Sequence, residues 1–598
     1  MQEAVEYPPT NATAPQLTFR AVGTGMLFGG LLSLCNIYLG LKIGWGMNMS
    51  ITAALLGFGF WQVSTRAFKL RKFGLLENNI NQTAASAGAS ISSAGLVAPI
   101  PALTMLTGRT LSWVELSAWV LSVALVGVVV AVGLRKQMLV VDNLPFPGGV
   151  ATGQTLKEIY AKGAEAMARV KMLLAGMVAG AAGKLAEVLG WVSKVAFPGS
   201  LSTASGGVLA GKGHTAISLK NLGFALDPSI MMIAVGAIIG MRAAASMMLG
   251  AVIAWLFVAP EVMELGWAEA GKADPAAMWF GPLVKWMLWP GVAMMVTASL
   301  TSFAFSGKAI LNAFRRTGDA TEDPHDVPRK THLIAIAVVS AVSVVLQVWL
   351  FDIGVGLAIF GVLLTFVLAI VAGRVSGETG VTPVGAMGKV TQLSFGVIDP
   401  GNAASNLMAA NVTGGAASQC ADLLHDLKSG LMVGSVPRYQ IISQACGVVS
   451  GALMGSAAYL VLIPDPKNQL LTDEWAAPAV AQWKAVAEVF QQGLEAMPEG
   501  ALGAMAVGAV AGIVLSILEK TLPKKTAKWV PSPVSIGLAF AIPAYYAFSF
   551  FLGAVIYEIA KRVSDSWTKR FAIVLAAGIM AGESLMGVGD AIYKMVSG

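Results

Sequence analysis

Long apolar runs follow one another along nearly the whole chain, with short polar connections between them. Trp119–Leu134, Met232–Val258 and Ile334–Phe351 are three examples. A run of about 20 apolar residues is long enough to cross the hydrocarbon core of a bilayer as a helix. The apolar residues are continuous rather than alternating, which favours helices over the strands of a membrane barrel. The sequence therefore predicts an all-α polytopic membrane protein.

The composition agrees with this class of protein. Hydrophobic residues make up 56% of the 598 positions and charged residues 12%, whereas soluble domains carry about 25% charged residues. The 67 glycines suit close helix packing, because a residue without a side chain lets two backbones approach each other. The formal charge of +7 then marks cytoplasmic loops, and we expect no nucleic-acid partner.

We place sixteen apolar segments along the chain, counting two that are unusually polar. With the N-terminus inside, basic clusters such as Arg66–Lys72 and Lys520–Lys528 fall in the cytoplasm and the acidic loops fall outside. The cluster Lys561–Arg570 does not fit this path, and the segment 531–557 before it contains prolines that favour a break. We expect a multi-pass protein of the inner (cytoplasmic) membrane with a cytoplasmic N-terminus. The approximate segments are 19–43, 47–65, 78–106, 113–134, 172–195, 223–240, 242–259, 284–305, 332–351, 353–373, 379–396, 399–415, 440–463, 501–519, 531–557 and 571–597.

An internal repeat divides the chain into two halves. Glu77 opens the third segment and Glu378 the eleventh, and two further short similarities also recur eight segments apart. An even shift gives both halves the same orientation, so we expect two parallel eight-segment repeats. The predicted order is a cytoplasmic N-terminal tail (1–18), a first repeat (19–306), a cytoplasmic linker (307–331) and a second repeat (332–598) with an extracytoplasmic loop (464–500).

Polar stretches interrupt the apolar pattern at corresponding places in the two halves. Glu77–Ser90 and Glu378–Gly388 each begin with a carboxylate. Residues with hydroxyl or amide side chains follow, and each stretch then consists mainly of Gly and Ala. Such stretches cannot face lipid, because their backbone and carboxylate need protein or water around them. A third stretch, Asp399–Asn411, contains Pro400–Gly401, which cannot continue a regular helix. We therefore expect broken or re-entrant segments that line a central cavity.

Three carboxylates are the candidates for carrying a coupling proton: Glu583, Glu378 and Glu77. A carboxylate at membrane depth costs about 2.5–3.5 kcal/mol on insertion scales, so it must be protonated, paired or hydrated. Each of these states suits either proton exchange or contact with a substrate amine. The alternative for Glu77 and Glu378 is a structural charge at the start of a helix, where the helix dipole favours it.

Amide and hydroxyl side chains, most of them in the same stretches, are the candidates for substrate binding. They have the hydrogen-bonding groups that a peptide backbone or a carboxylate requires, and the N-termini of broken helices would help with the anion. The alternative is hydrogen bonding between helices, worth about 0.6 kcal/mol per contact. The candidates are Asn78, Asn81, Gln82, Thr83, Thr379, Thr382, Asn402, Asn406 and Ser584.

The sequence shows no pattern typical of an enzyme, a metal centre or a cofactor site. Its three cysteines form no CxxC pair and its four histidines form no HExxH. No Asp-rich pair or nucleophile elbow is placed at the end of a span. We therefore assign no catalytic residue, no metal ligand and no cofactor, and a membrane-embedded enzyme is a less favoured alternative.

Four short motifs, in this order and spacing, resemble the oligopeptide transporter (OPT) superfamily, closer to its prokaryotic and yellow-stripe-like members than to the fungal peptide branch. Asn36–Gly44 is similar to the first span of that family. Leu144–Gly153 resembles its Leu-x-aromatic-Pro-Ser/Thr-Gly-x-Ala-x-Ala stretch. Val530–Val534, followed by Ile542–Pro543, is similar to its Val-Pro-x-Pro element, and Ala581–Val588 resembles its last-span Gly-acidic signature.

The resemblance covers almost the whole chain, with local departures. Gly148 stands where the family has a hydroxyl residue, and Gly153 stands where it has the last Ala of the second motif. The resemblance implies a proton-coupled secondary active transporter, a symporter with about sixteen spans that imports small oligopeptides or peptide-like metal chelates by alternating access. Its partners would be a small-molecule substrate, protons and the lipid bilayer, with homo-oligomerisation left open. A passive channel for small polar solutes is the alternative.

Overall fold

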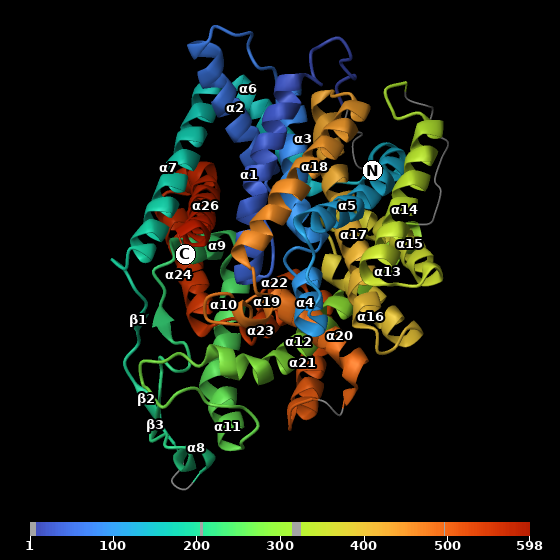
Figure 1. The fold of residues 1–598 in the computed structure, drawn as a ribbon. Coiled ribbons are helices and arrows are strands. Elements are labelled where there is room, and N and C mark those ends of the chain that lie inside the picture. Colours follow the sequence, from blue (N-terminus) through green and yellow to red (C-terminus); the bar gives the residue numbers. More distant parts are fainter. Residues whose placement is uncertain (1–6, 204–206, 314–323, 495–496, 598) are drawn as a thin grey trace.

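The computed structural model describes residues 7–203, 207–313, 324–494 and 497–597 of the protein. Residues 1–6 of the expected N-terminal tail and 314–323 of the expected linker lie outside the described residues. Helices make up most of the described chain (Figure 1). The first-half helices are α1 (Phe19–Ile43), α2 (Ser50–Ala67), α3 (Leu75–Ala89), η1 (Ser90–Ala94), α4 (Pro99–Thr107), α5 (Trp113–Arg135), η2 (Lys136–Val141), α6 (Pro147–Ala161), α7 (Gly163–Val188), α8 (Val208–Gly211), α9 (Ile230–Ile239), α10 (Met241–Ala251), η3 (Val252–Val258), α11 (Ala259–Glu264), α12 (Phe280–Ala304) and α13 (Gly307–Ala313).

The second half of the chain continues the helical pattern. The helices here are α14 (Arg329–Phe351), α15 (Val355–Thr379), α16 (Val384–Ile398), α17 (Ala403–Val433), α18 (Pro437–Leu462), α19 (Pro466–Gln469), α20 (Pro478–Gln492), α21 (Ala501–Thr521), α22 (Lys524–Ala527), α23 (Pro533–Ala539), α24 (Ala544–Val563), α25 (Asp565–Trp567), η5 (Thr568–Ala572) and α26 (Ile573–Ser597).

Within the described residues, eleven helical segments are long and apolar enough to cross a membrane, and α9 is a shorter apolar helix. The predicted class, an all-α polytopic membrane protein, is therefore confirmed. The eleven spans do not establish sixteen crossings or two parallel eight-segment repeats, so these stay predictions. The expected segment 531–557 is broken, because α23 ends at Ala539 and α24 starts only after Pro543.

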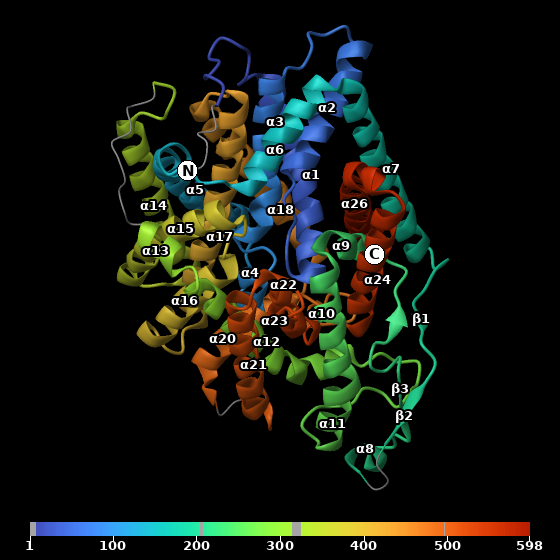
Figure 2. The same cartoon turned by 180° about the vertical axis from the view of Figure 1, so that it is seen from behind.

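Close glycine contacts hold the peripheral helices in parallel pairs, which both views show side by side for α7 and α26 (Figures 1 and 2). A methyl group at Gly180 of α7 would lie 2.1 Å from the carbonyl oxygen of Ile579, and one at Gly582 of α26 would lie 1.9 Å from that of Met177. These backbones therefore touch only because neither residue has a side chain. The pair α12 and α21 repeats the arrangement through Gly508.

Helix α17 runs through the interior and is buried along almost its whole length. It packs against α3, α5, α15 and α16. Its start follows a chain reversal at Gly401, where φ is +82°, and the Asn402 side chain caps the helix by accepting a hydrogen bond from Ser405 N at 3.0 Å. Contacts of Ser429 with Asn79 and of Asp422 with Ser86 show that α17 and α3 are antiparallel.

The only strands in the described residues form two small antiparallel ribbons between α7 and α9. β1 (Val195–Ala196) pairs with β4 (Ala225–Leu226), and β2 (Ser200–Ser202) pairs with β3 (Ala216–Ser218). This excursion lies at one edge of the molecule, next to α24 and α11 (Figure 1). The central part of the bundle, around α17, is therefore formed by helices.

Candidate functional site

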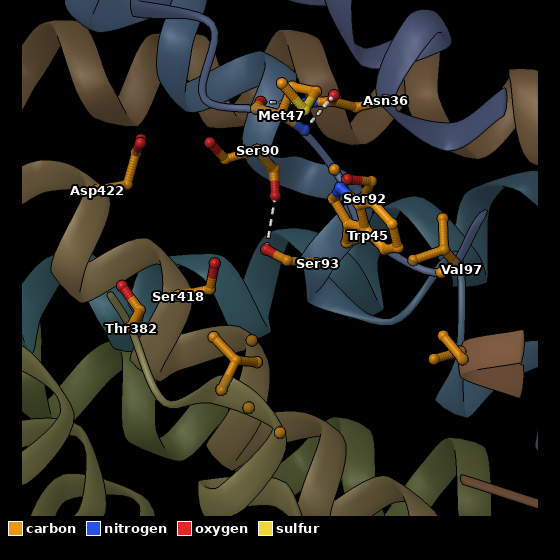
Figure 3. Close-up of a pocket in the computed structure, with 18 of the residues that line it drawn as sticks. Asn36, Trp45, Met47, Ser90, Ser92, Ser93, Val97, Thr382, Ser418 and Asp422 are labelled. Atoms are coloured by element: carbon orange, nitrogen blue, oxygen red, sulfur yellow. Dashed lines mark hydrogen bonds between the residues drawn. The ribbon is translucent and has the colours of Figure 1, made fainter. Parts of the chain in front are cut away.

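A cavity of about 590 Å³ lies between the first and second halves of the chain, where several helices are interrupted (Figure 3). Its walls are the loop 44–48 after α1, the helix η1, one face of α17, the segment 380–385 and the start of α20. The polar residues that line it are Asn36, Asn48, Ser90, Ser92, Ser93, Thr382, Asn411, Ser418, Asp422, His425 and Gln482.

The break after α3 builds one wall of the cavity. The α-helix ends at Ala89, continues as the tighter η1 and reverses at Gly95, where φ is +124°. A side chain at Gly95 would also collide with Asn411, 2.5 Å from its Oδ1. Within η1 the Ser93 hydroxyl donates to the Ser90 carbonyl at 2.7 Å (Figure 3). Glycine is therefore required at this turn both for its backbone conformation and for the close approach.

Asn36 fixes the opposite wall. Its Nδ2 donates to the carbonyls of Met47 and Ala89, both at 3.0 Å, and its Oδ1 accepts from Met47 N at 2.9 Å. One side chain thus ties the loop after α1 to the end of α3. Figure 3 shows Asn36 and Trp45 on one side of the cavity, with Asp422 on the other.

Helix α17 supplies a polar stripe to the cavity. Asn411, Ser418, Asp422 and His425 are separated by seven, four and three residues, so they lie on one face of the helix. Asn411 Oδ1 accepts from Trp119 Nε1 at 2.8 Å. Its Nδ2 has no hydrogen-bond partner among the described residues. This wall of the cavity therefore contains a buried amide whose oxygen is held by Trp119 and whose nitrogen has no partner in the described residues.

The other polar members of the stripe are held by neighbouring helices. His425 Nδ1 accepts from Gly149 N at 3.1 Å, so its Nε2 carries the proton and donates to Ser376 Oγ at 3.1 Å. Asp422 Oδ1 accepts from Ser86 Oγ at 3.2 Å. The histidine is thus a neutral structural group, whereas Asp422 brings a carboxylate to the edge of the cavity.

A buried lysine lies behind the wall formed by α20. Lys389 is 1% exposed and its Nζ donates to Gln392 Oε1 at 2.6 Å. The same ammonium lies 4.5 Å from the centre of the Trp483 ring, which lines the cavity. The ion pairs of the described residues do not include Lys389. The surroundings of this amine are therefore an amide oxygen and an aromatic ring, without an anionic partner in the described part of the chain.

The three predicted carboxylates lie apart from one another. Glu77 is 1% exposed and forms ion pairs with Arg20 and Arg71 at the start of α3. Glu378 is exposed at the end of α15 and pairs with Arg374 at 3.0 Å. Neither lines the cavity. For Glu77 and Glu378 the geometry matches the structural alternative rather than a site facing the cavity.

Glu583 is buried beside the start of α9. One carboxylate oxygen accepts from Ser229 Oγ at 2.5 Å and the other from Met231 N at 2.8 Å. Within the part of the chain that the structure describes, no ion pair involves Glu583. It lies outside the cavity lining. Its carboxylate is therefore held by hydrogen bonds and not by a direct ion pair with any described residue.

The predicted substrate-binding residues of α3 bond to neighbouring helices. Asn78 Nδ2 donates to the Ala54 carbonyl and Asn81 Nδ2 to that of Ala21. Gln82 reaches Ser429 at 3.5 Å, and Thr83 donates to the Asn79 carbonyl within its own helix. All four are buried but none lines the cavity. Their contacts are mainly those between and within helices, as in the alternative interpretation.

The candidates of the second half are divided between several environments. Thr382 lines the cavity (Figure 3). Thr379 donates to the Val375 carbonyl, and Asn402 caps α17. Asn406 accepts from Gln392 Nε2 at 2.9 Å, and the Ser584 hydroxyl lies 3.5 Å from Met231 Sδ. Of the nine predicted substrate-binding residues, Thr382 alone lines this cavity.

The cavity does not resemble a metal centre of the protein. Among the described residues, no three His, Cys, Asp or Glu side chains are grouped closely enough to hold a metal ion. The groups that the cavity offers are amides, hydroxyls, one carboxylate and aromatic rings. These are groups that bind polar organic molecules rather than a bare transition metal.

Apolar helices around a solute-sized cavity with polar side chains in its lining define a polytopic membrane protein that can hold a small polar molecule. A family model described as OPT oligopeptide transporter protein matches residues 16–593. The chain therefore belongs to the OPT oligopeptide transporter family, a family of transporters and not of enzymes.

Relatives of known name match over nearly their full lengths. "Putative oligopeptide transporter YGL114W" of Saccharomyces cerevisiae is 24% identical, over 99% of this chain and 98% of its own. "Metal-nicotianamine transporter YSL2" of Arabidopsis thaliana is 22% identical, over 95% of this chain and 92% of its own. The family resemblance expected from the four short motifs is confirmed by these matches.

Proposed function

We propose that this protein is a proton-coupled symporter that imports small oligopeptides or peptide-like metal chelates by alternating access, with the cavity as its substrate site. The observation that carries the proposal is the cavity itself, which polar side chains from both halves of the chain line. Its volume of about 590 Å³ lies within the roughly 300–1,000 Å³ typical of small-molecule sites.

The polar groups around the cavity suit a peptide-like substrate. Asp422 offers a carboxylate to a substrate ammonium group, and the amides of Asn48 and Gln482 offer donors to a substrate carbonyl or carboxylate. Thr382 adds a hydroxyl from the second half. Peptides and amino-acid-derived chelators carry all of these complementary groups.

A chelated metal would enter with its own ligands. The described residues contain no group of side chains suited to hold the ion, so recognition would act on the chelator rather than on the metal. The names of the relatives include both oligopeptide and metal–nicotianamine transporters. Both substrate classes therefore remain in the proposal, and binding experiments decide between them.

Among the three predicted proton-coupling carboxylates, Glu583 has the strongest support. It is 2% exposed, lies mid-helix in α26 and accepts its hydrogen bonds from a hydroxyl and a backbone N–H. Glu77 and Glu378, by contrast, already form ion pairs with arginines. We place the protein in the inner membrane with its N-terminus in the cytoplasm, and we retain the two-repeat arrangement as the basis of alternating access.

Uptake into proteoliposomes tests the proposal. Purified protein is reconstituted and given a labelled tripeptide or a metal–nicotianamine complex, with and without an imposed proton gradient. Accumulation above the external concentration, abolished by a protonophore, supports symport. Equilibration without accumulation supports the passive channel, and no uptake of either substrate contradicts the proposed function.

A further inference from the structure

Two acidic residues on α17, Asp422 and Asp426, lie one helical turn apart. Asp422 lies at the cavity edge, and Asp426 lies one turn further along the helix, where it is 1% exposed. Asp422 accepts from Ser86 Oγ at 3.2 Å and from Gln444 Nε2 at 3.4 Å. Asp426 Oδ1 accepts from Ser50 Oγ at 3.4 Å. Both carboxyl groups are therefore surrounded by α2, α3 and α18.

The surroundings of this pair lack a positive charge. In the described part of the chain, no ion pair includes either aspartate. Asp426 Oδ2 has no hydrogen-bond partner there, and the same holds for the Oε1 atoms of Gln82 and Gln444. Two adjacent carboxylates cannot both stay ionised in such a place, because like charges and burial each disfavour the second ionisation.

The nearby titratable groups on α17 are already used in other contacts. His425 bonds Gly149 and Ser376, and it faces away from the pair toward α6 and α15. Lys428 donates to Tyr7 Oη at 2.7 Å and to Asn143 Oδ1 at 3.1 Å. The contacts that α2, α3 and α18 make with the two carboxyl groups come from serine hydroxyls and glutamine amides. None of these residues supplies a positive charge that could neutralise one of the two carboxylates. That charge must therefore come from a proton or from a bound molecule.

Two serines connect the aspartates. Ser50 Oγ and Ser86 Oγ are 2.9 Å apart, so hydrogen-bonding contacts run from Asp426 Oδ1 through both hydroxyls to Asp422 Oδ1. A hydroxyl can accept a proton on one side while it donates its own on the other. When Asp426 is protonated it donates to Ser50, Ser50 donates to Ser86 and Ser86 donates to Asp422. Transfer along this path converts protonated Asp426 and ionised Asp422 into ionised Asp426 and protonated Asp422, and each serine replaces the proton it gives with the one it accepts.

We propose that Asp422, Asp426 and the two serines form a proton-binding site of the transporter that opens to the substrate cavity through Asp422. The inference rests on the proposed symport function and adds a second acid site to Glu583. A substrate ammonium at Asp422 favours ionised Asp422, so the shared proton stays on Asp426 while substrate is bound. Departure of the substrate lets the proton return to Asp422 and leave through the cavity.

Reconstituted variants test this site. Gradient-driven uptake is measured against substrate exchange without a gradient, in wild type, Asp426→Asn and Ser86→Ala. Asp352→Asn is the matched control, because Asp352 is exposed and pairs with Arg109 at the surface. The proposal predicts loss of the gradient-driven component in both site variants and no loss in the control. An unchanged driven component in Asp426→Asn, or uptake driven by a sodium rather than a proton gradient, overturns it.

A second measurement does not depend on transport. Infrared spectra of the purified protein at neutral pH report the carbonyl band of protonated carboxyl groups. The site predicts that part of this band disappears in Asp426→Asn and remains in Ser86→Ala and Asp352→Asn. A band identical in wild type and Asp426→Asn contradicts the site even if symport is confirmed. If the wild type shows no uptake but part of the band still disappears in Asp426→Asn, only the proposed function is contradicted.

Discussion

Arg20 donates to both carboxylate oxygens of Glu77, from Nε at 2.9 Å and from Nη2 at 2.6 Å. Thr18 donates to the same carboxylate at 2.8 Å, and the backbone N–H of Gly74 completes the set at 3.2 Å. A buried carboxylate with this many donors is stabilised in its charged form. Glu77 thus joins the starts of α1 and α3, which holds in place the helix that ends at the cavity.

Glu77→Gln is expected to destabilise the protein. The substitution leaves Arg20 and Arg71 without an anionic partner, at a cost on the order of 2–3 kcal/mol, between the values for exposed and buried pairs. The midpoint of thermal unfolding in detergent should fall. Glu378→Gln is the matched control, because Glu378 is exposed and its loss should cost less than about 1 kcal/mol. Equal midpoints for the two variants would contradict this role of Glu77.

Gly582→Ala is expected to separate α7 from α26. The new methyl would lie 1.9 Å from the Met177 carbonyl oxygen, so the helices must move apart or the variant must fail to fold. Gly589→Ala on the same helix meets nothing within 4 Å and should leave the unfolding midpoint unchanged or slightly raised. Comparable expression and midpoints for both variants would show that the close packing is not required.

Glu583→Gln is expected to abolish proton-driven uptake while the protein still inserts and folds. Glutamine can occupy the same space beside Ser229 and Met231, but it cannot exchange a proton. Uptake in proteoliposomes, measured over a range of external pH, is the readout, and monodispersity on gel filtration controls for folding. Wild-type rate and pH dependence in this variant would remove Glu583 from the coupling mechanism.

Asp227 should make stability depend on pH. Burial raises the pKa of its carboxyl above the ordinary value of 3.8, and Lys194 opposes this only in part. The folded state therefore binds more protons than the unfolded state just above that value, and stability falls as pH rises through this window. Asp227→Asn keeps the acceptor for Ser229 N and should reduce the fall in stability as pH rises above about 4.

Thermal midpoints across that pH range check the assignment. The exposed Glu269 provides the control, since Glu269→Gln should show the same dependence of the thermal midpoint on pH as the wild type. Asp473, whose carboxyl pKa is also raised by burial, accounts for a residual slope in Asp227→Asn. Parallel curves for wild type and Asp227→Asn would contradict the prediction.

The sequence was sufficient to predict the class of the protein and its family, because hydropathy and motif order are properties of the chain itself. It also pointed to two polar stretches, 77–90 and 378–388, of which Ser90 and Thr382 do line the cavity. It could not tell a cavity-facing carboxylate from an ion-paired one. Arg20, the partner of Glu77, lies 57 residues earlier in the chain, and sequence spacing does not reveal such a contact.

Most of the α17 stripe was missed, since of its four residues only Asn411 lay in a stretch that was expected to line a cavity, although the signal is local. The stripe consists of four polar residues at helical spacing, Asn411, Ser418, Asp422 and His425. The last three lie after Asn411, where the polar stretch predicted from the sequence ends. The polar residues 78–83 of α3 were conspicuous by contrast, yet they bond to neighbouring helices or to their own. Local density of polar residues was therefore a poorer guide to the cavity than their periodicity along one buried helix.

The central claim is that substrate occupies the cavity beside α17, and protection of a cysteine at position 418 tests it most directly. Ser418→Cys is introduced after Cys35, Cys420 and Cys446 are replaced by alanine, and alkylation by a small maleimide is timed with and without transported substrate. Glu269→Cys, at the surface, is the control. We expect substrate to slow alkylation at position 418 and not at 269. Equal rates at position 418 with and without saturating substrate would place the substrate elsewhere and contradict the account.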